Sequence, residues 1–117
     1  GRHAGPHLVL SVDEVDSGSW DAVIAGPGPV LVDIWAPWCV PCRKVRPMVE
    51  GLADEFAPGL GVVTLNGDAA PAIMARFQVL SLPTLLLFVD GTLVDRVVGV
   101  PKIAKLRAVV EPYLGVD

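Results

Sequence analysis

Cysteine is scarce in this sequence, with two residues, Cys39 and Cys42, among 117. A fold held together by several disulfides is therefore excluded, and a single C-x-x-C pair remains to be explained. Histidine is equally scarce, and both His3 and His7 lie in or beside the N-terminal tail, where we expect them to be solvated. The chain thus offers few partners for a zinc site built on the cysteine pair.

Positive charge is also in short supply, because 13 acidic residues outnumber 9 Lys and Arg and give a formal net charge of -4. A surface for nucleic-acid phosphates is therefore not expected. The one basic cluster, Arg43, Lys44 and Arg46, is short and is predicted to solvate one face of a helix. No apolar run approaches the roughly 18 residues of a membrane span, so we expect no membrane partner either.

The length and composition are typical of one globular domain. Hydrophobic residues make up 52% of the chain and charged residues 19%. We predict a tail over residues 1–7 and a single domain over residues 8–117, and we expect a monomer. The opening residues, GRHAGPHL, lack the basic start, apolar core and small-residue cleavage site of a signal peptide, so a cytoplasmic location is expected.

Hydrophobic periodicity predicts strands that alternate with helices. The predicted strands cover residues 7–12, 29–36 and 60–66 and two runs within 83–100, and the predicted helices cover 13–26, 40–57, 69–79 and 101–114. Asp90 and Gly91 separate the last two strands, a pair of residues typical of a tight hairpin. The order β-α-β-α-β-α-β-β-α predicts an α/β fold with a mostly parallel sheet, helices on both faces and an antiparallel hairpin at one edge.

The cysteine pair directly follows the predicted central strand and stands at the start of the next helix. A C-x-x-C pair beside a β-α-β pattern is typical of a redox-active site. The alternatives are half of a zinc site or two inert core cysteines, although the flanking Trp38 and Pro41 favour an exposed pair. A helix start stabilises a thiolate, so the pKa of Cys39 is expected to fall from about 8.5 to roughly 3.5–7.5. Cys42, one turn into the helix, suits a second, resolving attack.

Asp33 is a charged residue within the apolar strand VLVDIW. A carboxyl that loses its hydration has a raised pKa and can accept a proton near neutral pH. The alternative is a structural aspartate that is satisfied by local hydrogen bonds.

The segment WAPWCVPC, with Asp33 upstream and SLPT downstream, resembles the thioredoxin family, and the resemblance extends from about Leu8 to Leu114. It implies a thioredoxin-like three-layer sandwich, with a central mixed sheet of about five strands flanked by about four helices. It also implies that Cys39 attacks substrate disulfides, that Cys42 resolves the intermediate and that Asp33 is the buried carboxylate behind the pair.

The same resemblance assigns roles to residues around the cysteines. It implies that Trp35 and Trp38 are the flanking tryptophans, that Pro47 kinks its helix and that Pro83 is a cis-proline facing the disulfide. With a cis bond, Leu82 could offer its N–H and C=O to an extended substrate. The implied substrate-binding residues are Trp38, Val40, Pro41, Leu82, Val98 and Gly99.

Two positions depart from the family pattern. Val40 stands where the family usually has glycine, which leaves the reduction potential open. Thr64 stands where many members carry a lysine near the buried aspartate, so the expected partner of Asp33 is absent.

The resulting hypothesis is a general protein disulfide reductase that works through a reversible Cys39–Cys42 dithiol and disulfide. The resemblance implies no bound cofactor, client proteins with disulfides, and a thioredoxin reductase that supplies reducing equivalents from NADPH. Two alternatives stay open: a dedicated redox protein with a narrow partner set, which Val40 favours, and a redox-insensitive scaffold module.

Overall fold

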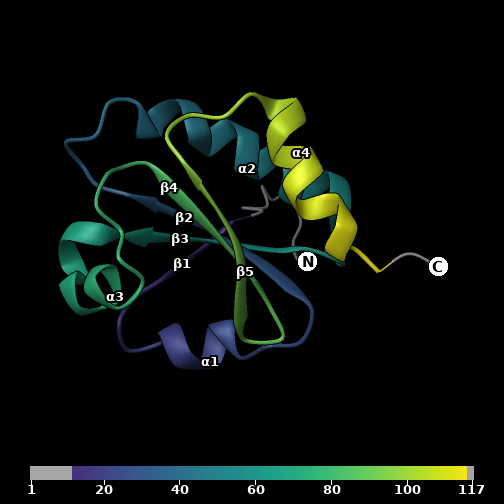
Figure 1. Cartoon of the computed structure of the whole chain (residues 1–117), viewed down its shortest axis with the longest axis horizontal. Helices are drawn as coiled ribbons and strands as arrows, with labels where there is room; N and C mark the ends of the chain where they lie inside the picture. Colours follow the sequence, from purple (N-terminus) through teal and green to yellow (C-terminus); the bar gives the residue numbers. More distant parts are fainter. Residues whose placement is uncertain (1–11, 116–117) are drawn as a thin grey trace, which may run out of the picture.

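One mixed sheet forms the centre of the computed structural model, which describes residues 12–115 (Figure 1). Its strands are β1 (Asp13–Val15), β2 (Pro29–Trp35), β3 (Gly61–Asn66), β4 (Thr84–Val89) and β5 (Thr92–Val98), in the order β1-β3-β2-β4-β5. Pairs β1–β3 and β2–β3 are parallel, whereas β2–β4 and β4–β5 are antiparallel. The predicted mixed sheet is confirmed, but it is not mostly parallel, because the first strand of the hairpin lies inside the sheet.

Two helices cover each face of the sheet, so the three-layer arrangement is also confirmed (Figure 1). The helices are α1 (Trp20–Ile24), α2 (Cys42–Phe56), α3 (Pro71–Arg76) and α4 (Ile103–Val110), with short 3-10 turns η1 (Gly67–Ala69) and η2 (Glu111–Tyr113). Helices α2 and α4 lie on one face, and α1 and α3 lie on the other. Within residues 12–115, no helix combines the length and apolarity needed to cross a membrane.

The two faces enclose separate apolar cores because successive side chains of a strand point to opposite sides. In β2, Val32 and Ile34 join the core under α1 and α3, which we call the α1/α3 core. Leu31 joins the core under α2 and α4, the α2/α4 core. Asp33 therefore points toward the α2/α4 side of the sheet.

The N-terminal region differs from the prediction. Residues 13–15 form β1 rather than the start of a helix, and only Trp20–Ile24 is helical in the predicted range 13–26. These residues form a strand because their backbone pairs with β3. Asp13 lies opposite Val63, and Val15 lies opposite Leu65. The predicted tail 1–7 and all but the last residue of the predicted strand 7–12 lie outside the described residues.

The hairpin between β4 and β5 is confirmed. Asp90 and Gly91 adopt positive φ values of 51° and 86°, which a two-residue turn of this kind requires. The Asp90 carboxylate also accepts a hydrogen bond of 2.7 Å from the backbone N–H of Gly28. This turn sets the register that brings the end of β5 back beside the start of β4.

Candidate active site

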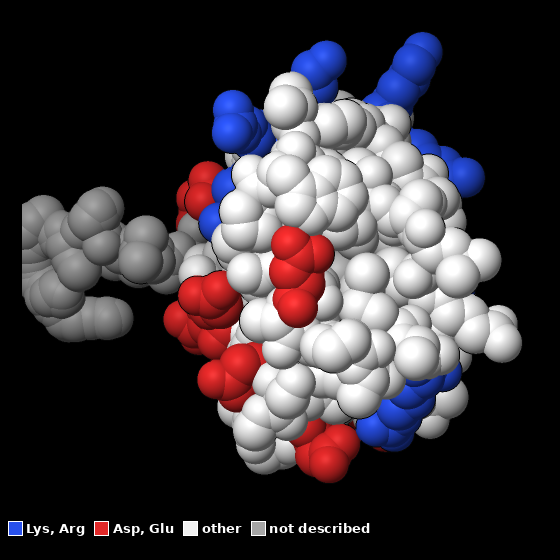
Figure 2. All heavy atoms as spheres, turned by 90° about the vertical axis from the view of Figure 1, so that its left-hand side faces the viewer, with Lys and Arg blue, Asp and Glu red and all other residues white. Residues whose placement is uncertain are grey.

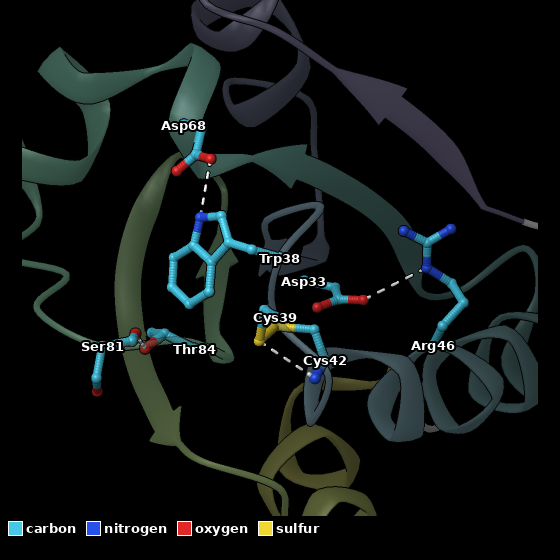
Figure 3. Close-up of a disulfide and its surroundings, with 8 residues drawn as sticks. All are labelled: Asp33, Trp38, Cys39, Cys42, Arg46, Asp68, Ser81 and Thr84. Carbon is cyan, nitrogen blue, oxygen red and sulfur yellow. Dashed lines mark hydrogen bonds and ion pairs between the residues drawn. A yellow bond between two sulfur atoms is a disulfide. The ribbon is translucent and has the colours of Figure 1, made fainter.

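The two cysteines form a disulfide that joins the loop after β2 to the first residue of α2 (Figure 3). Their Cα atoms lie 5.4 Å apart. Cys42 is the first residue of α2, and Cys39 lies three residues before it, outside the regular helix. The predicted pair therefore exists as a disulfide, which half of a zinc site does not explain.

The prediction that the cysteine pair is exposed is wrong for the cysteines themselves. Cys39 and Cys42 are only 3% and 5% exposed, because they pack with Ala36 against Trp35 and Leu82. A cavity of about 430 Å³ nevertheless borders both cysteines. The two cysteines are thus largely covered but border a cavity.

Backbone donors distinguish the two sulfur atoms. The N–H of Cys42, at the start of α2, donates a hydrogen bond of 3.3 Å to Sγ of Cys39. The N–H of Cys39 donates to the carbonyl of Ala36 at 3.0 Å, which closes the loop. Negative charge on Cys39 would therefore be stabilised by the N–H of Cys42 and by the positive end of the helix.

The segment around Pro83 lies against the disulfide. The Leu82–Pro83 peptide bond is cis, as the resemblance implies. Leu82 packs against the cysteine cluster, and the N–H of Gly99 donates to the carbonyl of Pro83 at 2.9 Å. The antiparallel register places Val98 opposite Thr84, so residues far apart in sequence meet beside the disulfide.

Several apolar side chains near the cysteines in sequence, or on the strand that pairs with the segment after Pro83, are exposed. Trp38, Val40 and Val98 are 65%, 61% and 61% exposed, as expected for a substrate-binding surface. Leu80, which belongs to no motif in the sequence, is 93% exposed and lies two residues before Leu82. Figure 2 shows the face that lies on the left in Figure 1, and much of its centre and right carries no charged side chain.

A hydrogen bond fixes the exposed tryptophan. Nε1 of Trp38 donates to Oδ2 of Asp68 in η1 at 2.9 Å (Figure 3). Asp68 is held in turn by its backbone N–H, which donates to Oδ1 of Asn66 at 3.0 Å. The sequence does not reveal this role of Asp68, because no sequence pattern links it to a tryptophan 30 positions earlier.

Asp33 is fully buried, with an exposed fraction of 0%. Its neighbours in register are Thr64 on β3 and Leu85 on β4, neither of which carries charge. Burial raises the pKa of the Asp33 carboxyl to about 6, against the opposing attraction of Arg46. Within residues 12–115, neither carboxylate oxygen has a hydrogen-bond partner, so the alternative of a structurally satisfied aspartate is not supported.

Asp33 does have a charged partner, although Thr64 replaces the lysine that the family resemblance would place beside it. Nε of Arg46 on α2 lies 3.6 Å from Oδ2 of Asp33, and the two side chains point toward each other (Figure 3). The prediction that Arg46 only solvates a helix face is therefore wrong, whereas Arg43 and Lys44 are exposed as expected. Helical spacing could have revealed the contact, because Arg46 follows Cys42 by one turn.

No group of three or more potential metal ligands is found within residues 12–115, and His3 and His7 lie outside that range. The chemistry that the described residues offer is therefore that of the disulfide, the buried carboxylate and the apolar surface around them.

Comparisons with known proteins agree on one family. The family model named Thioredoxin matches residues 11–112. Thioredoxin of Porphyra purpurea is 41% identical over 106 residues, which cover 90% of this chain and 99% of that protein. The chloroplastic M-type thioredoxin of Pisum sativum is 40% identical over 107 residues, covering 91% of this chain and 62% of that protein. A mutant thioredoxin from Halobacterium salinarum NRC-1 has a similar structure, with a TM-score of 0.82 and 30% identity over 95% of this chain and 98% of that one. With a matching domain, a matching fold and a disulfide at the motif, the chain belongs to the thioredoxin family of thiol–disulfide oxidoreductases.

Proposed function

We propose that this protein is a general protein disulfide reductase in which Cys39 attacks and Cys42 resolves. The observation that carries this assignment is the hydrogen bond of 3.3 Å from the N–H of Cys42 to Sγ of Cys39. A donor at a helix start stabilises a thiolate and lowers its pKa, so Cys39 is the better nucleophile of the two.

The reaction begins from the reduced protein. The Cys39 thiolate attacks one sulfur of a client disulfide, the client S–S bond breaks, and the first client thiolate leaves. Cys42 then gives up its proton and attacks Sγ of Cys39, which forms the Cys39–Cys42 bond and releases the second client thiolate. The client gains two electrons and the protein loses two, so the step balances.

We assign the proton from Cys42 to Asp33. A pKa of about 6 leaves this carboxyl mostly ionised at pH 7, yet more basic than an exposed aspartate. Its oxygens accept no hydrogen bond from other residues in the range 12–115, so they are available for a proton.

The client binds beside Cys39 in this proposal. An extended client segment would lie between Leu82 and Gly99. Leu82 packs on the cysteine cluster, and the N–H of Gly99 donates a hydrogen bond to the carbonyl of Pro83. The exposed apolar residues of this surface favour contact with apolar client side chains. They require no particular charge in the client, which suits a broad client range. These residues are Trp38, Val40, Leu80 and Val98, with the exposed Pro41 beside them.

Reducing equivalents are proposed to come from NADPH through a thioredoxin reductase, with no cofactor bound to this chain. The expected compartment is the cytoplasm, and cell fractionation tests it. The Pisum sativum relative is named as chloroplastic, but that name does not by itself assign this chain to a chloroplast.

Insulin reduction coupled to NADPH and a thioredoxin reductase tests the proposal. A general reductase turns over many insulin molecules, and the Cys39→Ser variant does not. Slow turnover of insulin together with rapid reduction of the Cys39–Cys42 disulfide by the reductase would instead indicate a dedicated redox protein. A disulfide that the reductase cannot reduce would indicate a scaffold.

A further inference from the structure

Four buried side-chain polar atoms without a hydrogen-bond partner are found in residues 12–115, and they lie in three residues. They are both carboxylate oxygens of Asp33, Nε1 of Trp35 and Nε of Arg46. Asp33 and Arg46 form an ion pair, and the guanidinium lies 5.7 Å from the centre of the Trp35 ring. Buried polar groups are rarely left unpaired, so this cluster calls for an explanation.

Arg46 is the cation of this cluster. A cavity of about 270 Å³ borders the cluster, and among the residues that line it Arg46 carries positive charge, whereas Asp13 and Glu14 are acidic and Thr64 is neutral. Thr64 and Leu85, the register neighbours of Asp33 on β3 and β4, are uncharged. Glu50, one turn after Arg46 on α2, acts in the opposite sense and raises the pKa of Asp33.

Arg46 also lies next to the reacting pair. It follows Cys42 by four residues on α2, and residues with this spacing share one face of a helix. It lines the cavity of about 430 Å³ that borders Cys39 and Cys42. Its side chain is 38% exposed, so the guanidinium keeps contact with solvent while Nε faces the buried carboxylate.

We propose that Arg46 is a positioning residue of this reductase, whose guanidinium keeps Asp33 ionised and oriented while Cys42 resolves the mixed disulfide. The proposal rests on the role of Asp33 as proton acceptor proposed above. Burial alone would push the pKa of Asp33 higher, and the positive charge of Arg46 opposes that rise. Without this cation a larger fraction of the carboxyl would hold its proton near neutral pH, and that fraction could not accept another.

The first test follows the ionisation of Asp33 directly. Carbon-13 NMR of the carboxyl group in the oxidised protein gives its titration midpoint in wild type and in three variants. Arg46→Met keeps an apolar stem over Trp35 but removes the charge, and we expect the midpoint to rise by about one pH unit. Arg46→Lys keeps the charge, and Lys44→Met removes a charge from an exposed site on the same helix. Both are expected to stay near the wild-type midpoint.

The second test measures resolution of the mixed disulfide against pH. A midpoint shifted from about 6 to about 7 slows resolution about fivefold at pH 6 and about twofold at pH 7 in Arg46→Met, with no slowing at high pH. A structural defect would slow the step at every pH. Arg46→Lys should restore the wild-type profile.

The outcomes separate the two proposals. An unchanged midpoint in Arg46→Met, or an equal rise in Lys44→Met or Arg46→Lys, overturns the role of Arg46 while leaving the role of Asp33 intact. If the midpoint rises as expected but Asp33→Asn resolves at the wild-type rate, Asp33 is not the proton acceptor, and the part of Arg46 in the reaction falls with it.

Discussion

The two faces of the sheet are built from the same strands but differ in what they bury. In the α1/α3 core, the rings of Trp20, Phe77 and Phe88 pack on one another with centroids 5.3 to 5.6 Å apart. On the opposite face, Asp33 and Thr64 interrupt a layer whose other buried residues are apolar. The α1/α3 face therefore buries an aromatic cluster, whereas the α2/α4 face gives up some stability to hold a carboxyl group that the chemistry needs.

A single strand, β2, contributes residues both to the aromatic core and to the reactive site. Val32 and Ile34 belong to the α1/α3 core, and Asp33 between them points to α2, where Arg46 and Cys42 share a helix face. Because strand residues alternate, a charge can be placed behind the disulfide without disturbing the aromatic core. Substitutions on the two faces should accordingly separate stability from reactivity.

The largest expected effect is on the nucleophile. Cys39→Ser should abolish insulin reduction, because serine cannot form the mixed disulfide. Limiting iodoacetamide should label Cys39 of the reduced wild type well before Cys42, and peptide mass spectrometry reads the order. Cys42→Ser is the control, since it should still attack clients but accumulate the mixed disulfide. Equal labelling of both thiols would contradict the assigned order.

A substitution in the aromatic cluster should change stability and not chemistry. Phe88 is 1% exposed, so Phe88→Ala should lower the free energy of unfolding by about 3–5 kcal/mol through lost burial and a residual cavity. Urea denaturation at pH 7 measures the loss. The rate of mixed-disulfide resolution in the folded fraction should stay at the wild-type value, and a large drop in that rate would show that the two faces are not separable.

Asp33→Asn should slow the chemistry and raise the stability at neutral pH. Since the folded pKa of about 6 lies above the unfolded value of about 3.8, wild type loses stability as the pH rises from about 4 to 6, by about 3 kcal/mol in total. The variant lacks this loss, so it should be more stable than wild type at pH 7 and similar to it below pH 4. Urea midpoints across this range provide the test, and a constant difference at all pH values would rule out the titration of Asp33 as its cause.

The smallest effect is expected at the rim of the active site. Leu80→Ser removes an exposed apolar contact, so KM for insulin should rise about threefold with kcat unchanged, as for the loss of one rim contact worth less than about 1 kcal/mol. Val94→Ser, a partly exposed apolar residue of β5, is the control and should leave KM unchanged. The same KM for Leu80→Ser and wild type would remove Leu80 from the client surface.

The sequence was sufficient for those parts of the site that depend on local patterns. The C-x-x-C pair after an apolar strand predicted the disulfide at Cys39 and Cys42, and the charge in that strand predicted the raised pKa of Asp33. The family resemblance supplied the cis bond before Pro83 and the three-layer fold. Each of these features is encoded within a short segment or a familiar motif.

The features that were missed depend on contacts between distant segments. Residues 13–15 were predicted as helix because their pairing with β3, some 50 positions later, leaves no local signal. The sequence around Arg46 predicts a solvent-exposed side chain, because a basic residue in a charged cluster is typical of a helix surface. The buried carboxylate that it contacts belongs to Asp33 on β2, a different segment of the chain. The cysteines were predicted to be exposed because the packing of Leu82 over them is also a long-range contact.

Resolution of the mixed disulfide against pH tests the central claim most directly. In a stopped-flow reaction of the reduced protein with dithiobis(nitrobenzoate), the first nitrothiolate reports attack by Cys39 and the second reports resolution by Cys42. We predict that the second phase of wild type accelerates through a midpoint near pH 6, where Asp33 ionises, and that Asp33→Asn lacks this component while its first phase is unchanged. Identical second-phase profiles in the two proteins would contradict the account, because the buried charge would then have no part in the reaction.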